Sequence, residues 1–117
     1  KKVGSMVNRL AELINFSKES PNDPFLIYAI TMEYKKMGDD VKTEQGFLEL
    51  ITSHERYVGT YYHYAKFLEE KNRKDEALGI YEKGMEIATQ ARNRHAFGEL
   101  KSAYQMAKGV DEDDWED

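Results

Sequence analysis

The chain has 117 residues, of which 40% are hydrophobic and 33% charged; this is room for one domain with a modest core. It contains no cysteine, which excludes disulfides, thiol nucleophiles and thiolate metal sites and fits a cytoplasmic location. No run of residues approaches the roughly 20 apolar side chains of a membrane span. Lys1 to Ser5, ahead of Met6, are interpreted as a cloning remnant.

The net charge of −5 is concentrated near one end of the chain. Six of the 22 acidic residues lie in the segment 110–117, together with Trp115, and the other 16 are balanced by 17 Lys and Arg residues. A near-neutral body without a basic stripe argues against nucleic acid as a partner. The segment 110–117 has too little apolar content to fold alone and is interpreted as an acidic disordered tail. An alternative hypothesis is that its acids and Trp115 dock in a basic groove of the same or a neighbouring chain.

Apolar residues recur every three to four positions along the chain, which is typical of amphipathic helices. A leading helix is predicted at residues 6–19, and Pro21 and Pro24 lie in the connector that follows it. The next helix pair lies in residues 24–57, where Gly38 separates the two helices because glycine suits the left-handed end of a helix. The stripes of this first part contain Leu10, Leu13, Ile14, Ile27, Ile30, Tyr34, Val41, Phe47 and Leu50.

A second helix pair is predicted in residues 58–91 and a closing helix at 94–108. Asp75 and Asn93 are the expected N-caps of the helices that follow them, and Gly109 is expected to end the last helix. The apolar stripes here contain Tyr61, Tyr64, Ala65, Leu68, Ala77, Leu78, Tyr81, Met85, Leu100 and Tyr104.

The two helix pairs repeat one pattern at a spacing of 34 residues. Large apolar residues match large ones, small match small, and turn residues match turn residues, whereas identity is confined to Tyr28 and Tyr62. The matched pairs include Ile27 with Tyr61, Ile30 with Tyr64, Thr31 with Ala65, Gly38 with Asn72, and Phe47 with Tyr81. One such pair cannot bury its apolar face alone, so stacked neighbours and covered ends are expected.

At these positions the chain resembles the tetratricopeptide repeat (TPR) family. The residues that carry the resemblance are Tyr61, Tyr64, Ala65, Leu68, Ala77, Tyr81 and Gly84 in the second pair and Ile27, Ile30, Tyr34, Thr43, Phe47 and Leu50 in the first. The resemblance implies an all-α, right-handed solenoid of antiparallel helix pairs with about six helices, forming a single domain over residues 6–109. The arrangement is also similar to that of short stand-alone bacterial TPR proteins.

The family resemblance implies a non-enzymatic module that binds a peptide or protein segment on a concave groove. The family's groove positions fall on Phe25, Tyr28, Met32, Lys35, Tyr62, Lys66 and Glu69, with Lys36 and Glu70 beside them. The alternative that we keep open is a self-associating structural module, in which two chains form a weak homodimer through the ends of the solenoid.

More specific chemistry finds no support in the sequence. Some TPR proteins clamp the C-terminal carboxylates of chaperones, but the matching positions hold Tyr28, Met32, His63, Asn93 and Phe97. None of these carries the clamp's cation, so no such clamp is expected. The three histidines are too far apart in sequence for a metal-ligand motif, and no phosphate-binding loop or nucleophile motif is present. We therefore expect no metal, no cofactor and no enzymatic activity.

Overall fold

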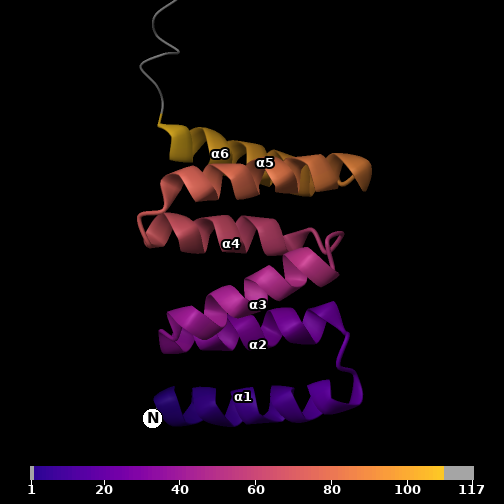
Figure 1. The fold of residues 1–117 in the computed structure, drawn as a ribbon, viewed down its shortest axis with the longest axis vertical. Coiled ribbons are helices and arrows are strands. Elements are labelled where there is room, and N and C mark those ends of the chain that lie inside the picture. Colours follow the sequence, from indigo (N-terminus) through magenta and orange to yellow (C-terminus); the bar gives the residue numbers. More distant parts are fainter. Residues whose placement is uncertain (1, 110–117) are drawn as a thin grey trace, which may run out of the picture. The chain divides into compact units, whose positions relative to one another are not determined.

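The computed structural model describes the backbone of residues 2–109 and the side chains of residues 8–109. Over this part of the chain it is all-α, with six helices and no strand (Figure 1), as predicted. The helices are α1 (Lys2–Glu19), α2 (Pro24–Met37), α3 (Asp40–Ser53), α4 (Gly59–Glu70), α5 (Lys74–Gln90) and α6 (Arg94–Lys108). The start of the leading helix was expected at Met6, but α1 begins earlier, at Lys2. The predicted acidic tail, residues 110–117, lies outside the described residues.

The helix ends follow from local side-chain chemistry. The carboxylate of Asp23 accepts a hydrogen bond from the Phe25 amide at 2.9 Å, which caps α2, and Asn93 caps α6 in the same way through the Ala96 amide. Both satisfy amides that the first helical turn leaves without a partner. The expected cap by Asp75 is wrong: α5 starts at Lys74, so Asp75 lies in its first turn. There its negative charge still favours the helix N-terminus.

Two turns at matching repeat positions use the same backbone conformation. Gly38 ends α2 with φ of 79°, and Asn72, which lies 34 residues later, has φ of 61° after α4. Glycine adopts this left-handed region without steric cost, and asparagine is among the residues that tolerate it best. The match that the repeat predicted between these turn residues is therefore seen in the backbone.

The contacts of the chain group it into two compact units, Lys1–Tyr57 and Val58–Asp117. In the first unit, α2 packs against both α1 and α3. Phe47 and Leu50 of α3 are completely buried. The hydroxyl of the buried Thr31 donates to the carbonyl of Ile27 at 2.7 Å, so the polar group is satisfied within its own helix.

One charged side chain is buried among the described residues of the first unit. Glu33 of α2 is 3% exposed, and its Oε2 accepts hydrogen bonds from Arg9 Nε at 3.0 Å and from Lys36 Nζ at 3.2 Å. Arg9 belongs to α1, so this ion pair links the leading helix to the first helix pair. The other oxygen, Oε1, is buried without a hydrogen-bond partner.

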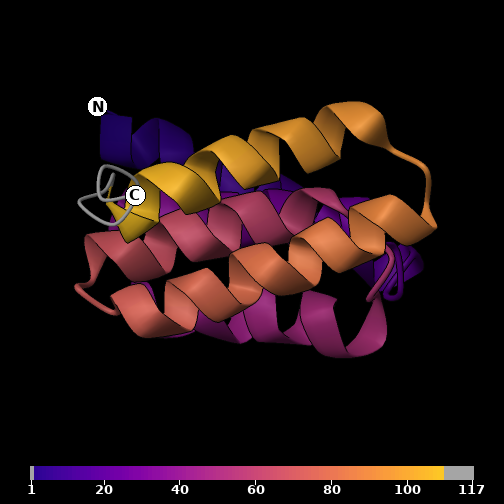
Figure 2. The same ribbon diagram turned by 90° about the horizontal axis from the view of Figure 1, so that it is seen from above.

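In the second unit, α5 packs against α4 and α6, and α4 also contacts α6. Figure 2 shows that α6 runs antiparallel to α5 and in the same direction as α4. The core is apolar and rich in aromatic rings: Tyr61, Phe67, Leu68, Tyr81 and Leu100 are at most 2% exposed. Gly84 of α5 lies against Tyr61, and a Cβ placed on it would be only 2.5 Å from the Tyr61 Cβ. The close approach of α4 and α5 therefore depends on this glycine.

Candidate functional site

The predicted groove residues of the first unit form a row along α2. Phe25 is 58% exposed, whereas Tyr28, Met32 and Lys35 are half-buried. The Tyr28 ring lies 6.0 Å from the ring of Tyr57 at an angle of 56°. Spacings of three and four residues place Tyr28, Met32 and Lys35 on one helix face. This face offers an aromatic ring, a flexible thioether and a cation.

The predicted groove residues of the second unit lie on α4. Lys66 holds its ammonium 5.9 Å from the centre of the Tyr62 ring, within the range of a cation–π contact. Glu69 has a different contact: its carboxylate accepts a hydrogen bond from the hydroxyl of Tyr81. Glu69 therefore links α4 to α5, and Tyr62 and Lys66 are the two members of this row that face a hollow.

That hollow lies between α4 and α6 and has a volume of about 610 Å³. One wall is formed by Tyr62 and Lys66. The other wall comes from α6, and it includes Arg94, Gly98, Ser102 and Met106. Met106 is 78% exposed, and the space above Gly98 is open, with nothing within 4 Å of where a Cβ would be. We call this hollow the α4–α6 groove.

The α6 wall was not predicted, because residues 94–108 were taken only as a closing helix. A signal was nevertheless present: Phe97, Leu100 and Tyr104 repeat the spacing of Tyr61, Tyr64 and Leu68, but 36 residues later instead of 34. The larger spacing accompanies a longer second helix in this pair, since α5 has 17 residues and α3 has 14. Helix α6 therefore matches the apolar spacing of α4, the first helix of the second pair.

The charges along the groove are unevenly paired. His95 Nε2 lies 3.2 Å from a carboxylate oxygen of Glu99 on the same helix. Lys66 and Arg94 form no ion pair with any residue in the described part of the chain. Lys66 and Arg94, on opposite walls of the groove, could therefore each form an ion pair with a carboxylate of a ligand.

Two tyrosines near the predicted rows, Tyr28 and Tyr81, have a raised pKa. Burial raises the pKa of Tyr28, and the neighbouring Tyr57 raises it further. Burial also raises the pKa of Tyr81, with the hydrogen bond to Glu69 as the second cause. At neutral pH these side chains therefore act as uncharged hydrogen-bonding groups with large apolar faces.

The first unit has a hollow of its own, with a volume of about 320 Å³. It is lined by Ile27, Ile30 and Tyr34 of α2 together with Lys42 and Gly46 of α3. None of these residues was predicted as a groove position; Ile27, Ile30 and Tyr34 were predicted as core. They are only half-buried here.

Among the described residues, no group of three or more His, Asp or Glu side chains is arranged to hold a metal ion. None of the described helices is long and apolar enough to cross a membrane.

Comparison with known proteins places the chain in a family. No protein-family model matches the sequence, and no curated protein matches it. Solved structures do match. The solution NMR structure of a tetratricopeptide repeat domain protein from Salinibacter ruber is 35% identical, with a TM-score of 0.74, and the match covers 79% of this chain and 93% of that one. A crystal structure of a tetratricopeptide repeat domain protein from the same organism is also 35% identical, with a TM-score of 0.71 and coverages of 76% and 100%.

Identity at this level over most of both chains shows that the chain belongs to the tetratricopeptide repeat family. The resemblance seen in the sequence is thereby confirmed. The family is a helical-repeat scaffold that typically mediates protein–protein interaction and is not an enzyme scaffold.

Proposed function

We propose that this protein is a non-enzymatic interaction module that holds a peptide or protein segment in the α4–α6 groove of its second unit. The observation that carries the proposal is the α4–α6 groove. Its volume of about 610 Å³ falls in the range of roughly 300–1,000 Å³ that is common for ligand sites. A groove of this size accepts a few consecutive side chains of a bound segment.

The lining of the groove supports a protein ligand. Tyr62 supplies a rigid aromatic surface, and Tyr and Arg are the residue types that most often dominate protein interfaces. Met106 supplies an exposed thioether that adapts its shape to different partners. Lys66 and Arg94 supply charge on the two walls. In the same proposal Phe25, Tyr28, Met32 and Lys35 of α2 form a second contact row, while Glu69 acts through its hydrogen bond to Tyr81.

A comparative pull-down tests this proposal. The double variant Tyr62→Ala, Lys66→Glu removes the aromatic surface and reverses the charge of the α4 wall, so bound partners should be lost. The matched control is Tyr104→Ala, Lys108→Glu, because Lys108 lies over Tyr104 with a similar separation of 5.3 Å and neither residue lines the groove. Thermal unfolding of both variants checks that they are folded. Equal retention of partners by the wild type and both variants would refute the groove assignment.

A second candidate is self-association, which the exposed apolar side chains of the first unit favour. Val41 and Leu48 of α3 are 68% and 47% exposed, and Phe16 of α1 is 62% exposed. Val41 and Leu48 lie seven residues apart, so they share one side of the helix. Light scattering at high micromolar concentration tests this candidate: a dimer that Val41→Lys, Leu48→Lys disrupts supports it, and a monomer rejects it.

A further inference from the structure

The α4–α6 groove has a definite ligand chemistry. Its two walls each present one cation that lacks an ion-pair partner in the described residues, Lys66 on α4 and Arg94 on α6. The carboxylates nearby are already engaged, since Glu99 pairs with His95 and Glu69 accepts from Tyr81. Opposite charge across an interface steers and orients a ligand. The groove therefore suits a segment that carries several carboxylates.

The floor of the groove adds a preference for a large apolar side chain. Gly98 exposes bare backbone beneath open space, and Tyr62 and Met106 border that space. An aromatic ring placed over Gly98 could pack against the Tyr62 ring and the Met106 thioether, contacts that are favourable for both partners. The complementary ligand is thus an acidic segment with one large aromatic residue.

The chain itself contains such a segment. Residues 110–117 hold six acidic side chains and Trp115, which is the single tryptophan of the sequence. They follow directly on α6, the helix that forms one wall of the groove and whose Met106 lies in its lining.

The distances permit docking within one chain. Trp115 is six residues beyond Gly109, and six extended residues span up to about 20 Å. From Gly109 back to Gly98 the helix rise amounts to about 17 Å. An extended tail that turns back along α6 therefore brings Trp115 level with Gly98. The acids before Trp115 then pass Lys66, and the acids after it approach Arg94.

We propose that residues 110–117 occupy the α4–α6 groove of their own chain, with Trp115 over Gly98 and Tyr62 and with carboxylates against Lys66 and Arg94. This inference rests on the proposed function, because it makes the tail a competitor of the external partner. Tethering gives the tail an effective concentration on the order of millimolar. A weak contact is then sufficient to keep the groove occupied until a tighter ligand displaces the tail.

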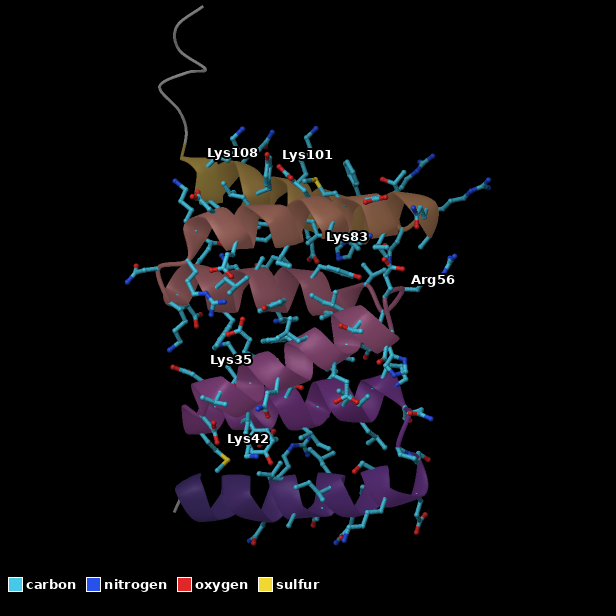
Figure 3. All side chains as sticks on the ribbon, in the orientation of Figure 1. Lys35, Lys42, Arg56, Lys83, Lys101 and Lys108 are labelled. Atoms are coloured by element: carbon cyan, nitrogen blue, oxygen red, sulfur yellow. The ribbon has the colours of Figure 1, made fainter. Side chains whose placement is uncertain are left out.

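The fluorescence of Trp115 in the chain of residues 1–117 tests the proposal. The expected result is emission at shorter wavelength, and weaker quenching by acrylamide, than for a synthetic peptide of residues 110–117. The variant Lys66→Glu, Arg94→Glu should return both readings to those of the free peptide. The matched control is Lys101→Glu, Lys108→Glu, which makes the same change in net charge on side chains that project from α6 away from α4 and α5 (Figure 3) and should leave both readings unchanged.

Three results would overturn the proposal. Trp115 readings equal to those of the free peptide in the wild type mean that the tail is not docked. Loss of the docked signal in the Lys101, Lys108 variant, with no loss in the groove variant, places the tail on the outer face of α6. A signal that vanishes on dilution makes the occupant a second copy of the chain.

A binding experiment on residues 1–117 with the six acids of the tail replaced by their amides separates tail docking from the proposed function. If the tail normally competes, this variant should capture partners, and should bind the synthetic peptide 110–117, several-fold more tightly than the wild type. Unchanged peptide affinity contradicts tail docking. Partner loss in the Tyr62, Lys66 variant would still support the groove, so the two failures are distinguishable.

Discussion

The two units build the same helix pair with different side chains at their closest contacts. In the first unit, Gly46 of α3 lies against Thr31 of α2, and in the second unit Gly84 of α5 lies against Tyr61 of α4. The two glycines are not equivalent in the repeat, because Leu50 corresponds to Gly84 and Ile80 corresponds to Gly46. Each unit therefore has a glycine opposite the side chain that approaches the facing helix most closely, Thr31 in the first unit and Tyr61 in the second.

The units also differ in the polarity of matching positions. Glu33, buried with its ion-pair partners in the first unit, corresponds to the buried Phe67 of the second. Phe47 corresponds to Tyr81, whose hydroxyl donates to Glu69. The 34-residue pattern thus specifies which side of each helix is buried. It does not specify whether a buried side chain is polar or apolar, which differs between the two units.

Gly84→Ala should destabilise the protein by about 3 kcal/mol, at the upper end of overpacking costs. The new Cβ would meet the Tyr61 Cβ at 2.5 Å and a Leu100 methyl at 3.1 Å, and a Cβ cannot rotate away, so α4 and α5 must separate. Urea unfolding followed by circular dichroism measures the change. A loss below about 1 kcal/mol would show that the contact is not tight and would remove the main difference between the units.

Gly46→Ala should cost less, about 2 kcal/mol. Its Cβ would lie 2.0 Å from the Thr31 hydroxyl oxygen, which can rotate away if it gives up its hydrogen bond to the Ile27 carbonyl. The contact with the Thr31 Cβ, at 2.9 Å, is longer than the one that Gly84→Ala makes with the Tyr61 Cβ, and a smaller shift of the helices relieves it. The second substitution Thr31→Ala introduces the residue type found at the matching position 65 and should recover more than half of the loss. A double-mutant cycle measures this coupling, and additive losses would contradict the steric explanation.

Tyr81→Phe introduces the residue type found at the matching position 47 of the first unit and should cost about 1 kcal/mol at neutral pH, the usual net value of one hydrogen bond. Because the pKa of Tyr81 is raised by burial and by Glu69, its stabilising effect is complete below the unfolded-state pKa of about 10 and falls as the pH rises above it. Unfolding free energies measured between pH 8 and pH 11 should decline less for the variant than for the wild type. Parallel curves would show that Tyr81 does not control the decline.

Gly79→Ala and Gly98→Ala should each stabilise the protein by roughly 0.5–1 kcal/mol, since glycine is unfavourable inside a helix. At both positions nothing lies within 4 Å of the added Cβ. Gly98 faces the groove and Gly79 lies on α5, so the pair also serves as a stability-matched set for binding assays. Destabilisation at either position would mean that the second unit is packed more tightly than its structure indicates.

Much of the local structure could be predicted from the sequence. The cap at Asn93 and the left-handed Gly38 depend on chemistry within a few residues, which is why these two features could be predicted. The cap expected at Asp75 was wrong because an acidic residue is equally favourable in the first turn. The α6 wall of the groove was missed because a search at a fixed spacing of 34 does not register a helix that recurs after 36 residues.

The all-α class, the helix pairs and the candidate row of Tyr62 and Lys66 follow from the amino-acid sequence, because helix periodicity and repeat spacing are properties of the linear chain. Tertiary structure alone decided which side chains face a hollow and which are engaged elsewhere. The repeat pattern assigned Glu69 and Lys66 to the same groove row, yet Glu69 of α4 accepts a hydrogen bond from Tyr81 of α5. Arg94 and Met106, which the pattern did not assign, line the groove from α6. Such contacts depend on distances between helices, which small residues such as Gly84 set to within an ångström and which no periodicity encodes.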